Sequence, residues 1–203
     1  DPENGDPLWY MDEKDANKNP TGRRVTTNDY SSADYYYVNK SSLPKVYGGF
    51  NTSLSWKGFD LSAIFAYSIG GYIYNRDITM ILHNGSLEGR DWSTEILKRW
   101  TPDNRYTDVP ALSTTSNNWN SASTRFLQNN SYMRLKNLTL SYNLPKQWIS
   151  KLSLSSVQVY VQGDNLFTIH RNQGLDPEQG ITGITYYRYP AMRTISGGIN
   201  VSF

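Results

Sequence analysis

The fold is decided by residues 191–203, which read AMRTISGGINVSF. Alternate positions are apolar or glycine, namely Ile195, Gly197, Ile199, Val201 and Phe203. The positions between them are polar or glycine, namely Thr194, Ser196, Gly198, Asn200 and Ser202. This alternation predicts a β-strand with one apolar and one polar face. A membrane-spanning strand needs about 9–11 residues, so the stretch is long enough to cross a bilayer.

Four stretches upstream show the same kind of pattern. They are 46–56 (VYGGFNTSLSW), 59–72 (FDLSAIFAYSIGGY), about 131–143 (SYMRLKNLTLSYN) and about 155–164 (SSVQVYVQGD). Lys57 and Gly58 separate the first two stretches, and such a short separation predicts a β-hairpin over 46–72. Residues 131–203 then carry the last three predicted strands. Five strands are too few for a closed bacterial barrel, which has about eight or more, so we expect part of a barrel.

Short and long connections alternate along the chain. The turn at 57–58 is short and the turn at 144–154 is moderate, whereas the long polar segments are 1–45, 73–130 and 165–190. Outer-membrane barrels have short periplasmic turns and long extracellular loops. If the last strand ends at the periplasmic side, all three long segments are extracellular. Within 73–130, residues 91–100 (DWSTEILKRW) predict a short helix capped by Asp91.

Composition excludes several classes of protein. The 203 residues include 20 Lys+Arg and 18 Asp+Glu, and the formal net charge of +2 argues against a nucleic-acid binder. Cysteine is absent from the sequence, so disulfides and thiolate chemistry are excluded. No apolar stretch is long enough for a transmembrane helix. No basic segment followed by an apolar core opens the sequence, so it predicts no signal peptide.

No motif predicts an enzyme, a cofactor or a metal site. His83 and His170 lie far apart and lack a second ligand at metal-binding spacing. Residues 15–20 (DANKNP) resemble the start of a calcium loop, but Pro20 replaces the glycine and Thr26 replaces the final glutamate. Nucleotide-binding glycine motifs and the G-x-S-x-G motif are also missing. We therefore expect a non-enzymatic protein without cofactors.

Several motifs, in order, resemble the SusC/RagA-type TonB-dependent outer-membrane transporters. They are SLPKVYGGFNTSLSWKGFDLSAIFAYSIGG (42–71), RWTPDN (99–104), SYMRLKNLTLSYNLPKQW (131–148), VQVYVQGDNLFTIHRNQGLDPE (157–178) and YPAMRTISGGINVSF (189–203). The resemblance implies an all-β fold, in which this chain supplies about five C-terminal strands of an antiparallel transmembrane β-barrel. The complete barrel would have about 22 strands and an internal plug.

The resemblance also implies function and partners. Such proteins lie in the outer membrane of Gram-negative bacteria and import oligosaccharides, or peptides in some members. They work with a SusD-like lipoprotein that acts as a lid, and with the TonB complex through an N-terminal part that this sequence lacks. The remainder of the barrel, the plug and outer-membrane lipid are therefore the other expected partners, and nucleic acid is not one.

Candidate site residues follow from the strand faces and the loops. For the lipid face and the barrel-assembly signal we expect Ile195, Ile199, Val201 and Phe203. For the lumen face we expect Gln158, Tyr160, Gln162, Thr194 and Asn200. Possible contacts with ligand or lid are Trp92, Trp100, Tyr186, Tyr187, Arg188 and Tyr189.

Two alternatives remain open on the sequence. The first is a soluble or surface-attached β-sandwich that binds carbohydrate, which would remain in solution without detergent. The second is a secreted hydrolase, for which no pair of carboxylates can be assigned to one site.

Overall fold

The computed structural model describes residues 1–203 except 86, 88, 114–117, 173 and 179. The chain divides into two compact units. The first unit comprises Asp1–Asn39 and Asn75–Leu127, and the second comprises Lys40–Tyr74 and Gln128–Phe203. The strands of the predicted sheet all belong to the second unit.

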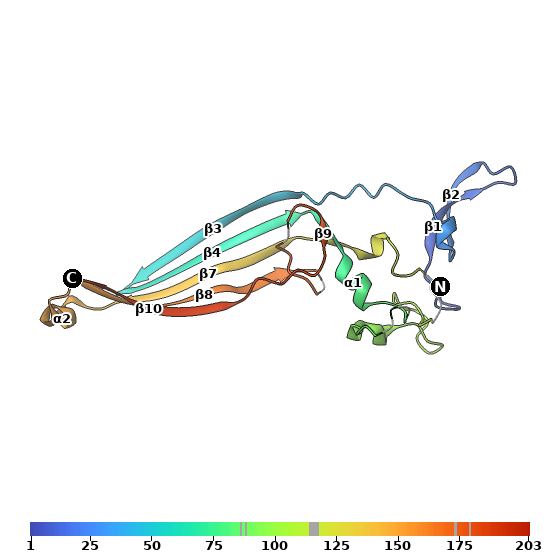
Figure 1. The fold of residues 1–203 in the computed structure, drawn as a ribbon. Coiled ribbons are helices and arrows are strands. Elements are labelled where there is room, and N and C mark those ends of the chain that lie inside the picture. Colours follow the sequence, from blue (N-terminus) through green and yellow to red (C-terminus); the bar gives the residue numbers. More distant parts are fainter. Residues whose placement is uncertain (86, 88, 114–117, 173, 179) are drawn as a thin grey trace. The chain divides into compact units, whose positions relative to one another are not determined.

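Five long antiparallel strands form one sheet in the second unit (Figure 1). They are β3 (Pro44–Trp56), β4 (Phe59–Gly70), β7 (Tyr132–Asn143), β8 (Ser156–His170) and β10 (Thr194–Ser202). Their order across the sheet is β10-β8-β7-β4-β3. Each coincides with a predicted strand, and β8 continues six residues beyond its predicted end. The all-β, antiparallel class is therefore confirmed.

The register places side chains of one kind in rows across the sheet. Leu61 of β4 pairs with Leu54 of β3 and with Leu140 of β7. Leu140 in turn pairs with Val161 of β8, which pairs with Gly197 of β10. Because successive residues of a strand point to opposite faces, this pairing gathers the apolar positions of all five strands on one face.

One register shift lies at the Pro44 end of β3, and another lies in the middle of the sheet. Ile64 pairs with Asn137, but the next residue, Phe65, pairs with Leu135, so Lys136 is an extra residue on β7. Because of the extra residue, odd-numbered positions before the bulge share a face with even-numbered positions after it. Leu135 therefore stays on the apolar face, and Arg134 takes the polar one.

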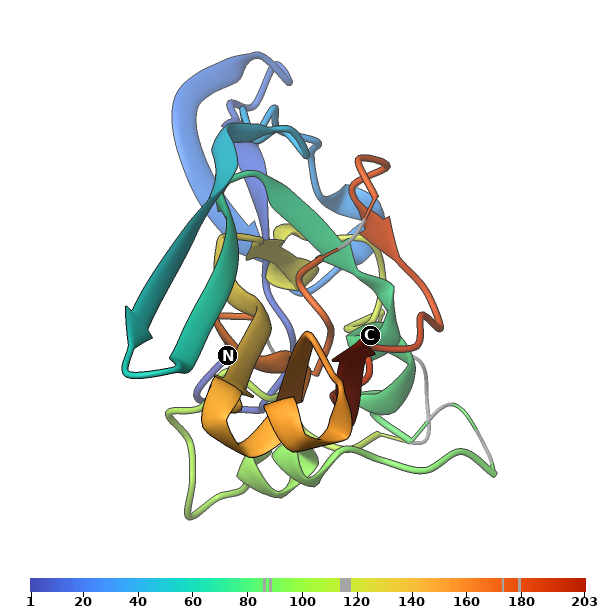
Figure 2. The same cartoon turned by 90° about the vertical axis from the view of Figure 1, so that its left-hand side faces the viewer.

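The β3–β4 turn requires an unusual backbone. Lys57 and Gly58 have φ angles of 47° and 87°. Two consecutive positive φ values are those of a type I′ turn, whose twist matches a two-residue hairpin. The β7–β8 connection is longer and contains α2 (Lys146–Ile149) and η4 (Ser150–Leu152), seen in orange at the front of Figure 2.

A small second sheet lies beyond the long strands. It has the order β6-β5-β9, with β6 (Leu127–Asn129), β5 (Tyr72–Asn75) and β9 (Ile184–Thr185). The backbone N–H of Tyr74 donates to the carbonyl of Gly183 at 2.7 Å. This sheet fixes part of the segment 171–193, which joins β8 to β10.

The first unit contains more regular structure than a loop prediction implies. Its hairpin consists of β1 (Trp9–Lys14) and β2 (Pro20–Thr27), and the 3-10 helix η1 (Tyr30–Ser32) follows. Helix α1 (Arg76–Ile81) and the 3-10 helix η3 (Thr124–Phe126) belong to the same unit. Its buried apolar residues include Ile78, Leu82, Ile96, Val109 and Phe126.

The predicted helix over 91–100 differs from the structure. The segment forms a five-residue 3-10 helix, η2 (Thr94–Lys98). The Ser93 hydroxyl accepts from the backbone N–H of Glu95, so Ser93 caps this helix in place of Asp91. Ile96 is buried on it, whereas Trp92 precedes the cap and contacts His83.

Among the residues that the structure describes, no helix has the length and apolar character needed to cross a membrane.

Replacing Gly58 tests the turn geometry. In Gly58→Val, the added Cβ would lie 3.1 Å from the carbonyl oxygen of Asn143, and the branched residue must adopt φ near 87°. Positive φ costs an L-residue about 1–2 kcal/mol, so we expect lower stability of the full-length protein, measured as its unfolding midpoint in detergent. Lys57→Asn is the control, since asparagine tolerates positive φ; equal midpoints for the two variants would contradict the assignment.

Candidate functional site

One face of the sheet carries a hydrogen-bonded row of polar side chains that crosses all five strands. The Asp60 carboxylate accepts from the Ser55 hydroxyl and, at 2.6 Å, from the Asn143 amide. The Gln158 amide donates to the Asn143 side-chain oxygen at 3.1 Å and accepts from the Asn200 amide at 3.2 Å. Each strand contributes one residue, so the side chains of this row are hydrogen-bonded to one another across the sheet.

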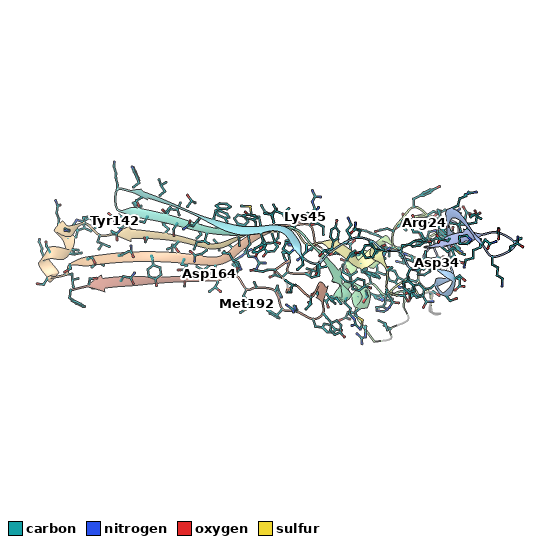
Figure 3. All side chains as sticks on the ribbon, turned by 90° about the horizontal axis from the view of Figure 1, so that it is seen from above. Arg24, Asp34, Lys45, Tyr142, Asp164 and Met192 are labelled. Atoms are coloured by element: carbon teal, nitrogen blue, oxygen red, sulfur yellow. The ribbon has the colours of Figure 1, made fainter. Side chains whose placement is uncertain are left out.

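The five residues predicted for the lumen share this polar face. Gln158 pairs with Asn200, Gln162 pairs with Ser196, and Thr194 pairs with Asp164. Tyr160 lies opposite Gly198, where an added Cβ would be 2.7 Å from the tyrosine hydroxyl oxygen. The structure therefore brings Gln158, Tyr160, Gln162, Thr194 and Asn200 together on one face. Figure 3 marks Asp164 in the middle of the sheet and Tyr142 toward the α2 end.

A buried ion-pair network on the same face fixes the segment 171–193. The Arg134 guanidinium donates to Asp176 at 2.5 Å, to Glu178 at 2.7 Å and to the Thr168 hydroxyl at 2.8 Å. The Lys136 ammonium donates to Glu178 at 2.6 Å. The Arg134 and Asp176 side chains are both more than nine-tenths buried. The network therefore attaches the segment to β7 and β8.

Asp176 is held in its charged form. Burial raises the pKa of the Asp176 carboxyl. The backbone N–H groups of Ala191 and Glu178, together with the Arg134 guanidinium, lower this pKa by more than burial raises it. The resulting pKa lies below the ordinary value of 3.8. The contribution of the carboxylate to stability is thus present above pH 3.8 and is lost as pH falls through the lower, folded-state pKa.

The opposite face of the sheet is apolar and exposed. Ile195, Ile199 and Val201 of β10 lie on it, and the first two side chains are 71% and 64% exposed. Leu54 of β3 and Leu140 of β7 share the face and are also exposed. Phe203 follows the last residue of β10 and is 92% exposed. Apolar patches of this extent mark a surface that meets lipid or protein.

The two predicted tryptophan contacts belong to the first unit and are engaged within it. The Trp92 indole N–H donates to Nδ1 of His83 at 3.1 Å, and the Trp100 indole N–H donates to the Pro2 carbonyl at 3.0 Å. An added Cβ at Gly5 would lie 2.7 Å from the Trp100 ring, so that ring packs closely on the backbone. Trp92 keeps 46% of its surface exposed.

The predicted tyrosine contacts belong to the second unit. The rings of Tyr186 and Tyr187 lie 4.3 Å apart, and Tyr189 is the most exposed of the three tyrosines. Arg188 lines a hollow of about 530 Å³ together with Arg193 and Phe167. The ion pair of Arg134 and Asp176 also lines this hollow. The segment fixed by Arg134 thus presents aromatic and cationic groups at one place.

Sequence reasoning missed Arg134. In the structure, Asp176 and Glu178 of the predicted loop 165–190 are paired with Arg134 and Lys136. The signal that could have found the network is an arginine inside an alternating strand, because arginine is almost never fully buried unless it is paired. Among the described residues, no cluster of three or more metal-binding side chains occurs.

Comparison with known proteins gives a consistent set of relatives. The chain is 34% identical over 166 residues to TonB-dependent receptor P3 of Formosa agariphila, covering 76% of this chain and 16% of that protein. It is 31% identical over 182 residues to TonB-dependent receptor P26 of the same organism, covering 85% of this chain and 18% of that protein. It is 28% identical over 168 residues to TonB-dependent receptor SusC of Bacteroides thetaiotaomicron, covering 82% and 16%.

Solved structures agree with the sequence relatives. A chain in the structure of the RagAB peptide importer in its closed-closed state superimposes with a TM-score of 0.81 and 35% identity. The match covers 100% of this chain and 22% of that one. No family model matches the sequence. The match to this chain covers only 16% to 18% of the length of each of the three curated relatives.

Loss of Arg134 should release the segment 171–193. Since this chain has no cysteine, a spin label at Tyr189→Cys can report the motion of the segment if other cysteines of the full-length protein are replaced. In Arg134→Met, Asp176 loses its buried partner, which costs about 3–5 kcal/mol, and we expect a large mobile fraction in the spectrum. Lys136→Met is the control and should release less, because Arg134 still holds both carboxylates. An unchanged spectrum for Arg134→Met would show that the network does not hold the segment.

Acid should release the segment in the same way. The mobile fraction should stay constant from about pH 7 to about pH 4 and rise only as pH falls through the folded-state pKa of Asp176, which lies below 3.8. The same spin label in a pH titration measures this. A release centred near neutral pH would mean that a group other than Asp176 controls it.

Proposed function

Since the chain is homologous to a segment of the SusC/RagA-type TonB-dependent receptors, we propose that it forms part of the barrel wall of an outer-membrane importer. The observation that carries the proposal is the division of the sheet into an exposed apolar face and a polar, internally hydrogen-bonded face. The strands have 9 to 15 residues, so each is long enough to span a membrane, which takes about 9–11 residues. Lipid then contacts the apolar face, and the polar face lines the lumen.

The polar row supports this orientation. Hydrocarbon offers no hydrogen bonds, so amides and a carboxylate are costly there even when paired. Asp60, Asn143 and Gln158 would be on the wrong side if their face met lipid. A water-filled or plugged lumen suits the same groups, so Gln158, Tyr160, Gln162, Thr194 and Asn200 are proposed to line it or support the plug.

We propose that the imported material is either peptides, because a chain of the RagAB peptide importer superimposes on this one, or oligosaccharides, which the resemblance to SusC/RagA-type transporters implies. A SusD-like lipoprotein would cover the extracellular side, and TonB would supply energy through the part outside this chain. Tyr186, Tyr187, Arg188 and Tyr189 are the favoured ligand or lid contacts, because their rings and guanidinium are exposed. Trp92 and Trp100 are weaker candidates, because their indole N–H groups have partners in the first unit.

The soluble β-sandwich accounts less well for the same sheet. A sandwich buries the apolar face of each sheet against a second sheet. In this chain the apolar face stays open, as the exposed side chains of Leu54, Ile195 and Ile199 show. The exposed face is the specific observation that favours the membrane-embedded reading.

Cell fractionation and uptake test the proposed function together. The full-length protein should be recovered with the outer membrane, and cells should take up a labelled oligosaccharide mixture or a labelled peptide mixture only when it is present. Tyr186→Ala with Tyr187→Ala should reduce uptake at unchanged protein level, whereas Tyr106→Ala, another exposed tyrosine, should not. Recovery of the full-length protein in the soluble fraction would refute the proposal.

Neighbouring residues of β10 test which face meets lipid. Ile199→Arg places a charge on the proposed lipid face, where arginine costs about 2–4 kcal/mol near the midplane and less near the interface. We expect less folded protein in the outer membrane and a lower unfolding midpoint in lipid. Asn200→Arg, one residue on and facing the lumen, is the matched control with a smaller effect. The reverse order of the two effects would mean that the faces are exchanged.

A further inference from the structure

We propose that the apolar face carries a binding site for a phosphate-bearing acyl lipid, at the end of the sheet remote from the Lys57–Gly58 turn. The site is a hollow of about 740 Å³, a size within the range of about 300–1,000 Å³ of small-molecule sites. Strands β3, β4, β7 and β8 all contribute to its lining. The inference rests on the proposed function, because it takes the apolar face as the one that meets lipid.

The floor of the hollow suits an acyl chain. Val46 pairs with Ile69, Tyr67 pairs with Met133, and Met133 pairs with Ile169, so these five lining residues share the apolar face. Val46, Ile69 and Ile169 are each more than half exposed. Tyr67 approaches Gly48 so closely that an added Cβ there would lie 3.0 Å from the tyrosine hydroxyl. The tyrosine thus lies over a strand position that carries no side chain.

The rim of the hollow suits a phosphate. Arg171 follows the last residue of β8 and lines the hollow beside the polar Asn129 and Ser131. His170 and its partner Tyr132 also line the hollow, but their strand positions belong to the polar face. None of the residues that line it is an aspartate or glutamate, so its formal charge is positive. A guanidinium binds phosphate through two parallel hydrogen bonds, and basic pockets beside membrane segments bind anionic headgroups.

The position of the hollow matches the headgroup level. From Phe59 beside the turn to Ile69 in the hollow, β4 advances ten residues, or about 33 Å at about 3.3 Å per residue. A strand tilted by about 40° then rises about 25 Å, which is the height of the apolar band of such barrels. Arg171 therefore lies where the hydrocarbon ends and the phosphates of the lipids begin.

Native mass spectrometry of the full-length protein in detergent tests the proposal. The probes are diphosphorylated lipid A, the same lipid without its phosphates, phosphatidylethanolamine and inorganic phosphate. We expect lipid A to be retained most strongly, and Arg171→Glu to weaken its apparent affinity at least tenfold. Lys151→Glu, a charge reversal in the β7–β8 turn at the other end of the sheet, is the matched control and should leave retention unchanged. Ile169→Trp fills the hollow while keeping it apolar, and it should also reduce retention.

Each other outcome has a definite meaning. Unchanged retention in folded Arg171→Glu overturns the proposal, and so does equal retention of lipid A with and without phosphates. Displacement of lipid A by inorganic phosphate at similar concentration would assign the site to free phosphate and overturn the lipid. These results leave the proposed function intact, because assembly into the outer membrane is measured separately. Recovery of the protein outside that membrane refutes the proposed function, and this inference with it.

Discussion

Backbone pairing across five strands is the constraint on which the second unit depends. A ladder of antiparallel hydrogen bonds sets which residues lie opposite one another, and the pleat then sends alternate side chains to opposite faces. Since a slip of one residue would exchange the faces of a strand, the sequence must keep one parity in every strand. Strand β7 changes parity at Lys136, and the bulge there restores the match with both neighbours. The amphipathic character of the whole sheet follows from this register.

The bulge also determines what the polar face can hold. It moves Arg134 onto that face beside Thr168 of β8, within reach of Asp176 and Glu178. An arginine buried without these carboxylates would be strongly unfavourable, so the strand and the segment 171–193 stabilise each other. The segment that carries Tyr186, Tyr187 and Arg188 is therefore held by an electrostatic contact as well as by backbone pairing. Rigid support of this kind reduces the ordering cost of binding a ligand.

Local patterns in the sequence predict the strands and their faces, because alternation is visible within ten residues. The hairpin turn is likewise predictable from Lys57 and Gly58 standing between two alternating stretches. The partners of Arg134 are not, since Asp176 and Glu178 lie more than forty residues away and pair through tertiary structure. The sequence predicts a helix over 91–100 capped by Asp91, whereas Thr94–Lys98 form a 3-10 helix. In the structure Ile96 is buried, while Trp92 and Trp100 each find a separate hydrogen-bond partner. The β1–β2 hairpin was not predicted, because residues 1–45 were assigned as one long polar segment; in the structure its turn is closed by Asp15 and Asn19.

The close approach of Tyr160 to Gly198 has an evolutionary consequence. The ring occupies the space that a side chain at position 198 would need, so neither residue can change freely while the other stays the same. In relatives where position 160 has a small residue, position 198 is released to carry a side chain of its own. The pair should therefore covary, which makes it a marker of β8–β10 pairing that can be read from aligned sequences.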